Sequence, residues 1–167
     1  MFSKNAAQDL FQDYAAAWRG NAAGDIAAAW DSDRFVLYKA EEVPHFFLNW
    51  QQVLEYWRQN ERLHERVVLR FSELRPVSLS ERLSLVLARM RWDIRFAPDA
   101  VLADGSAFSH RGQAMGGDNH VLAILGARRD SPGSWRLRGW SETPDAPISY
   151  IRSLFLAQAD LTLLDQD

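Results

Sequence analysis

The chain has 167 residues, enough to bury a substantial core, and we expect a single domain over residues 1–167. Its formal net charge is -3, and Lys and Arg occur at most in pairs, so the sequence offers no basic field for nucleic acid. It contains no Cys, which excludes disulfides, thiolate metal sites and a cysteine nucleophile and fits a cytoplasmic location. No apolar run approaches the ~18 residues of a membrane span, so we expect no membrane association.

The first half of the chain is predicted to be mainly helical. In residues 5–19, apolar side chains recur at helical spacing and Gly20 is placed to end the helix. A short second helix follows, with Asp25 as its capping residue. Residues 34–40 have the β-branched and aromatic content of a strand. A third helix is expected over 49–63, with Asn49 as its cap.

The second half is predicted to form a sheet of long antiparallel strands. We expect strands over four ranges, with residues 98–106 as a loop: 65–76, 81–97, 107–126 and 135–142. Pro76 should mark a break or an edge position, and the last two strands should form a hairpin whose turn contains Pro132. A carboxy-terminal helix should start near Pro147, with Ile148, Ile151, Leu154 and Phe155 on one face. This order predicts an α+β fold whose helices lie on one face of a bent sheet, where they can enclose a ligand cavity.

Three segments resemble the NTF2-like superfamily and, within it, the SnoaL-like and ketosteroid-isomerase-like branch. They are Gly24-Asp25-Ile26 before the short helix, VLEYWRQNE at 53–61, and WRLRGWSE at 135–142. The resemblance implies a cone: a strongly curved mixed or antiparallel sheet with three helices from the amino-terminal half on its concave face, plus a carboxy-terminal helix. That fold hosts isomerases, dehydratases, cyclases, epoxide hydrolases and binding modules, so it does not define a reaction.

The resemblance argues against ketosteroid isomerase itself, because that chemistry needs a carboxylate base and an oxyanion hole made of a Tyr and a protonated acid. The family's base position falls at or next to Tyr38. The position of its Tyr falls near Ala17, with Tyr14 one turn earlier, and the acid position falls in the apolar segment 123–125. By the same resemblance, Trp140 and Trp57 are expected to face the cavity.

The most suggestive polar cluster is GGDNHV at 116–121. Two glycines inside a strand indicate a bulge or a close backbone approach. Asp118 and His120 are two residues apart, so they share a strand face and could act as an acid and base pair. The alternative is that both point outward while Val121, Ala123 and Leu125 line the interior.

Two other polar sets have simpler interpretations. Arg89, Arg91, Asp93 and Arg95 alternate with apolar residues, which is typical of a solvated strand face opposite an apolar face that includes Met90 and Trp92. His64, at the end of the third helix, is interpreted as a cation favoured near a helix carboxyl terminus. Neither the spacing of the four His nor Asp118 with His120 predicts a metal site.

The sequence therefore predicts a protein that binds a small apolar or aromatic molecule, without a cofactor or metal. Asp118 and His120 are the candidate catalytic residues of a cofactor-free isomerase, dehydratase or cyclase. The predicted cavity walls are aromatic residues and one methionine: Tyr14, Tyr38, Trp57, Met90, Trp92 and Trp140. The alternative is a noncatalytic interaction module, and we expect a homodimer in either case.

Overall fold

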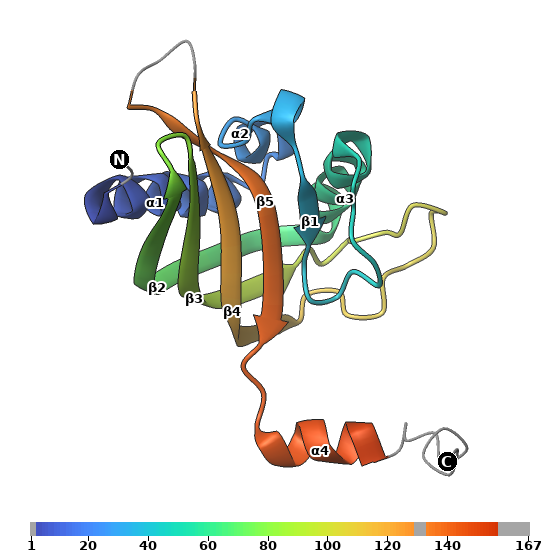
Figure 1. Cartoon of the computed structure of the whole chain (residues 1–167). Coiled ribbons are helices and arrows are strands. Elements are labelled where there is room, and N and C mark those ends of the chain that lie inside the picture. Colours follow the sequence, from blue (N-terminus) through green and yellow to red (C-terminus); the bar gives the residue numbers. More distant parts are fainter. Residues whose placement is uncertain (1–2, 129–132, 157–167) are drawn as a thin grey trace, which may run out of the picture.

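The computed structural model describes residues 3–128 and 133–156, and Figure 1 shows how their elements are arranged. The helices are α1 (Lys4–Gly20), α2 (Ala23–Ala27), α3 (Trp50–Leu63) and α4 (Ile148–Leu156), with a short 3-10 helix at Ser32–Arg34. The strands are β1 (Leu37–Lys39), β2 (His64–Ser80), β3 (Leu83–Phe96), β4 (Ala114–Ala127) and β5 (Trp135–Pro144).

The five strands form one mixed sheet in the order β1-β5-β4-β3-β2. The four long strands pair with one another in antiparallel fashion, and β1 runs parallel to β5 with Tyr38 beside Trp140. Pro76 lies in β2, an edge strand of this sheet, as its missing N–H predicts. In Figure 1 the strands curve in front of α1, and α2 and α3 continue the same helical layer. The fold is α+β, as predicted from the sequence.

Most element boundaries are close to those predicted, with three differences. The strand expected over 34–40 is shortened to β1 because the 3-10 helix precedes it. The strand expected from residue 107 begins only at Ala114, because residues 98–113 form a longer loop. The predicted hairpin turn at Pro132 falls in residues 129–132, outside the described part of the chain.

The helix caps were predicted correctly for α3 but not for α2. Asn49 caps α3 through a 2.8 Å hydrogen bond from the backbone N–H two residues on. Asp25 does not cap α2, which starts two residues earlier. There the Ala23 N–H donates to the Glu61 carboxylate of α3 at 3.3 Å, so a distant side chain replaces the local cap.

The aromatic core lies between the helical layer and the inner face of the sheet. Phe11 and Tyr14 of α1 pack on Trp140 of β5, with ring centroids 5.9 and 5.2 Å away. Trp18 continues this stripe toward α3, with its ring 6.2 Å from that of Trp57. The apolar face predicted for the first helix is therefore the face that covers the sheet.

The carboxy-terminal helix α4 stands away from this core (Figure 1). Its predicted apolar side chains are largely exposed, including Ile148 at 69% and Phe155 at 62%. Among the described helices, none is long and apolar enough to cross a membrane.

Candidate functional site

A cavity of about 310 Å³ lies between the inner sheet face, α1, α3 and the crossing segment that follows β1. This volume is at the lower end of the range usual for small-molecule sites. Five of the six predicted wall residues line it: Tyr14, Tyr38, Met90, Trp92 and Trp140.

Trp57 is the exception among the predicted wall residues. It is buried in the aromatic cluster behind the cavity, where its ring lies 5.6 Å from Tyr38 and 5.7 Å from Trp30. The face of α3 that reaches the cavity carries Tyr56, Asn60 and Leu63 instead. These residues are spaced by four and three, so they form a helical stripe about 100° away from Trp57.

Gly117, the second residue of the double glycine of β4, shapes one wall of the cavity. The β3–β4 register continues without interruption through Gly116 and Gly117, so the glycines mark a close approach and no bulge. A Cβ added at Gly117 would lie 3.0 Å from the Trp92 ring. The missing side chain thus lets the indole of Trp92 lie across β4, where its N–H donates to Asn119 Oδ1 at 3.4 Å.

Glu142 is the central ionisable group of the cavity. Its carboxylate lies on the inner face of β5 and accepts hydrogen bonds from Asn119 Nδ2 at 2.9 Å and Trp140 Nε1 at 2.6 Å. Burial raises the pKa of Glu142 to about 7, and the nearby carboxylates of Glu42 and Glu41 add to this effect. A carboxyl group with this pKa can both accept and donate a proton near neutral pH.

Two more carboxylates line the cavity near the crossing segment, those of Glu41 and Glu42. The Tyr56 hydroxyl donates a hydrogen bond to Glu42 Oε1. Glu41 Oε2 is buried and has no hydrogen-bond partner among the described residues. The polar end of the cavity is therefore acidic, while its other walls are aromatic and aliphatic.

Tyr14 and Tyr38 line the same cavity. Burial raises the pKa of both residues above the usual value for tyrosine. Both hydroxyls therefore stay protonated over the physiological pH range and can donate hydrogen bonds to a ligand oxygen.

His64 lies at the junction of α3 and β2 and also lines the cavity. Asn21 fixes this junction by donating from Nδ2 to the His64 carbonyl at 2.9 Å. Burial lowers the pKa of His64 to about 4, so its ring is neutral at pH 7, contrary to the predicted cation at a helix end. Its Nδ1 is buried without a hydrogen-bond partner among the described residues.

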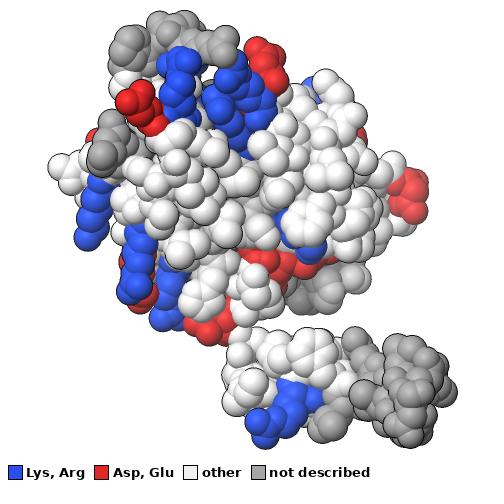
Figure 2. Space-filling view, viewed as in Figure 1, with Lys and Arg blue, Asp and Glu red and all other residues white. Residues whose placement is uncertain are grey.

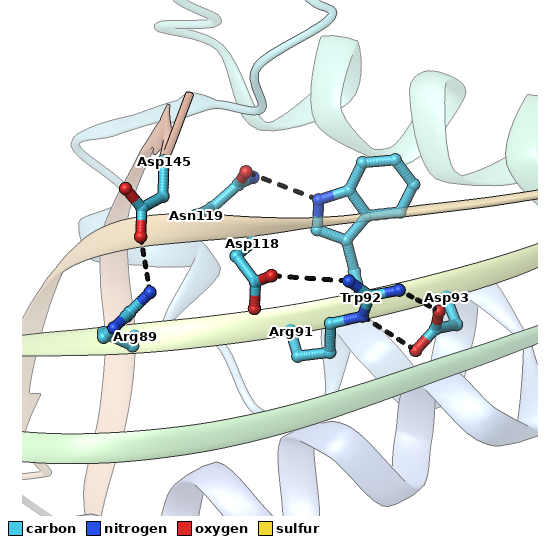
Figure 3. A network of polar contacts seen from close by, with 7 residues as sticks. All are labelled: Arg89, Arg91, Trp92, Asp93, Asp118, Asn119 and Asp145. Atoms are coloured by element: carbon cyan, nitrogen blue, oxygen red, sulfur yellow. Dashed lines mark hydrogen bonds and ion pairs between the residues drawn. The ribbon is translucent and has the colours of Figure 1, made fainter. Parts of the chain in front are cut away.

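Asp118 and His120 share a face of β4, as predicted, but this face points away from the cavity. Their side chains are 47% and 60% exposed, and neither lines the cavity. Asp118 pairs with Arg91 of β3 (Figure 3), with a separation of 3.3 Å. His120 lies 3.9 Å from Asp145. The outward alternative therefore describes their positions, because the period of two turns Asn119 and Val121 inward instead.

Several polar residues in or beside the cavity were missed in the sequence analysis, among them Glu142, its partner Asn119 and His64. Asn119 and Glu142 each occupy the apolar side of an alternating strand, next to Val121 and Trp140, and a polar residue at such a position was the available signal. His64 had no comparable signal, because its burial depends on Phe96, whose ring lies 5.4 Å away on the neighbouring strand. In the described part of the chain, no group of three or more His, Cys, Asp or Glu side chains is arranged to hold a metal.

Comparison with known proteins identifies structural relatives only. No family profile matches the sequence, and no curated protein sequence resembles it significantly. Among solved structures, a hexachlorocyclohexane dehydrochlorinase from Novosphingobium barchaimii is 12% identical with a TM-score of 0.62, covering 86% of each chain. A candidate scytalone dehydratase from Novosphingobium aromaticivorans is 10% identical with a TM-score of 0.67, covering 85% of this chain and 83% of its own.

A third similar structure is named after its fold superfamily. It is an NTF2-like superfamily protein from Salmonella enterica, 11% identical, with a TM-score of 0.62 over 86% of this chain and 92% of its own. Such low identities say nothing about chemistry, but the shared architecture extends over most of every chain. The protein therefore has the fold of the NTF2-like superfamily, as the resemblance of its sequence predicted.

Proposed function

We propose that this protein binds a small, largely apolar or aromatic molecule in its cavity and catalyses a cofactor-free proton transfer on it, as an isomerase or lyase. The observation that carries the proposal is the buried Glu142 carboxyl group, held by Asn119 and Trp140 and having a pKa of about 7. A carboxyl group held in an aromatic cavity is a strong base once ionised, because water no longer solvates its charge.

The surrounding groups suit a reaction that starts by removing a proton from carbon. Glu142 would take the proton, and the hydroxyls of Tyr14 and Tyr38 would donate hydrogen bonds to an oxygen on which negative charge develops. Neutral His64 could bond to the migrating or departing group through its free Nδ1. An isomerase would return the proton to another carbon, whereas a dehydratase would lose the hydroxyl group as water.

The names of two structural relatives agree with this reaction class. One is a hexachlorocyclohexane dehydrochlorinase and the other a candidate scytalone dehydratase, both of which are lyases by name. Their identities to this chain are too low to transfer a substrate, so the support is limited to the class of reaction.

A general-base probe tests the role of Glu142 without knowledge of the natural substrate. 5-Nitrobenzisoxazole is a small neutral aromatic molecule. Loss of its C3 proton to a base breaks the N–O bond and releases a coloured cyanophenolate. We expect the protein to accelerate this elimination, with a rate that rises with pH through about 7 as Glu142 ionises. Glu142→Gln should lower the rate by a factor of about 100 or more, the usual contribution of a general base.

The matched controls are Asp118→Asn and His120→Gln, which change ionisable groups on the outer face of the same sheet. Both should keep the rate within about twofold of the unmodified protein. Equal rates for Glu142→Gln and the unmodified protein would contradict the proposal, and loss of activity in the Asp118 or His120 variant would restore the original assignment.

A noncatalytic, dimeric interaction module is the second candidate. It is favoured by the exposed apolar side chains Leu87 and Leu122 on the outer sheet face and by the exposed apolar residues of α4. Figure 2 shows a broad uncharged area over the strands, bordered by basic and acidic groups. We expect a homodimer at micromolar concentration, measured by light scattering after size exclusion; a monomer would contradict this expectation. The predicted cytoplasmic location stays a prediction.

A further inference from the structure

The charges around the cavity are all of one sign. Three of its lining residues are the glutamates Glu41, Glu42 and Glu142, and none of the described lining residues is a lysine or arginine. Lys39, the last residue of β1, directs its ammonium group to backbone carbonyls, those of Ala40 at 2.7 Å and Glu41 at 3.3 Å. An anionic ligand would therefore enter an acidic site without a lysine or arginine to balance its charge.

The three carboxylates differ in what already binds them. Glu42 accepts the Tyr56 hydroxyl, and Glu142 accepts one hydrogen bond on each oxygen, from Asn119 and Trp140. Glu41 alone keeps a buried oxygen, Oε2, for which the described residues supply no donor. A buried acceptor without a donor is costly, and a ligand that brings a donor relieves that cost.

The walls next to these carboxylates are aromatic. Tyr38, Tyr56, Trp92 and Trp140 all line the cavity. The faces of such rings attract cations, whereas a carboxylate gains nothing from them. A cavity lined by both aromatic rings and carboxylates is suited to an ammonium group attached to a ring.

From these observations we infer that the ligand of the cavity is an aromatic amine in its protonated form, and that Glu41 receives its ammonium group. This inference rests on the proposed function and narrows its substrate class. It assigns Glu142 to proton transfer and Glu41 to recognition of charge, so the two carboxylates have separate roles. Aromatic carboxylates of the same size are excluded by the same arrangement.

Three indoles that share a ring and a two-carbon chain test this inference, with binding measured by isothermal titration calorimetry at pH 7. They are tryptamine, a cation; tryptophol, a neutral alcohol; and indole-3-propionate, an anion. We expect tryptamine to bind at least tenfold more tightly than tryptophol, and indole-3-propionate to bind most weakly. Glu41→Gln should remove the advantage of tryptamine and leave the affinity for tryptophol within about twofold.

Glu55→Gln is the matched control, because Glu55 is an exposed glutamate of α3 that does not line the cavity. It should leave all three affinities unchanged. Equal binding of indole-3-propionate and tryptamine, an unchanged preference in Glu41→Gln, or no binding of tryptamine would each overturn the inference. The benzisoxazole reaction distinguishes failure of this inference from failure of the proposed function. If the reaction still depends on Glu142, the proposed proton transfer stands although the ligand is not an amine. If it does not depend on Glu142, both the proposed function and the inference are wrong.

Discussion

The two faces of strands β3 and β4 carry polar residues of similar kinds in very different settings. On the outer face, Asp118 pairs with Arg91, and both side chains are more than two-fifths exposed. On the inner face, the neighbouring Asn119 is 1% exposed and bonds both Trp92 and Glu142. Figure 3 shows Asp118 beside Arg91 and Asn119 beside Trp92, one residue apart along β4.

The difference shows that environment, more than residue type, decides what a polar side chain can do. Exposed ion pairs contribute little, because water and salt screen their charges. Buried polar groups are strongly coupled, since each donor or acceptor depends on its one partner. This contrast explains why Asp118 and His120, although they are an acid and a base side by side, are worse candidates for catalysis than Glu142.

The largest expected effect that tests the contrast between the two sheet faces is the change that Glu142→Gln makes in the pH dependence of stability. The pKa of Glu142 is about 7 in the folded protein, against an ordinary value of 4.5 for a glutamate. As the pH rises, the carboxyl group ionises at a lower pH in the unfolded chain than in the folded protein. The free energy of unfolding therefore falls by about 3 kcal/mol between pH 4.5 and pH 8. The Glu142→Gln variant has no such group to ionise. The difference between its free energy of unfolding and that of the unmodified protein should therefore increase by about 3 kcal/mol across the same pH range.

Urea unfolding followed by tryptophan fluorescence at several pH values measures this difference. Asp118→Asn is the control on the outer face, and it should leave the pH profile nearly parallel to that of the unmodified protein. If the pH profile of Glu142→Gln were parallel to that of the unmodified protein, the Glu142 carboxyl group would ionise in the folded protein at little cost. The inner face would then be as favourable to charge as the outer face, which contradicts the contrast.

A smaller effect is expected from adjacent residues of β4. Asn119→Ala removes the donor to Glu142 and the acceptor for Trp92, so we expect a loss of about 2 kcal/mol in the free energy of unfolding. Asp118→Ala removes only an exposed ion pair, and its loss should stay below about 1 kcal/mol. Urea unfolding at pH 7 compares the two, and similar losses would contradict the assignment of the two faces.

The same pair of variants differs in its effect on the cavity. The hydrogen bond from Asn119 lowers the pKa of Glu142 against the effect of burial. Asn119→Ala should therefore shift the pH profile of the benzisoxazole reaction to higher pH, whereas Asp118→Ala should not move it.

Local patterns in the sequence predicted much of the fold. The period of two put Val121, Ala123 and Leu125 on one face of the strand. The structure shows that this face points inward. The resemblance to NTF2-like proteins supplied the curved sheet, and the adjacency of Tyr38 and Trp140 across β1 and β5 follows from it. Boundaries were less certain near residues 98–113, where the loop extends beyond its predicted end.

The composition of the site was harder to predict from the sequence. Which of Tyr56 and Trp57 faces the cavity depends on how α3 is rotated against the sheet, and both are large aromatic residues that fit a buried stripe. The strand pattern also left open which face was covered by helices, so Asp118 and His120 could be placed inside.

Sequence alone determined the helices, the strands, the alternation of their side chains and the acidic balance of the chain, because these depend on local spacing and composition. Only the tertiary structure decided that Glu142, Asn119 and Trp140 meet in one buried network, with Glu41 and His64 lining the same cavity. The reason is physical: a carboxyl group acquires a pKa near 7 only when distant segments remove its water and supply its remaining hydrogen bonds.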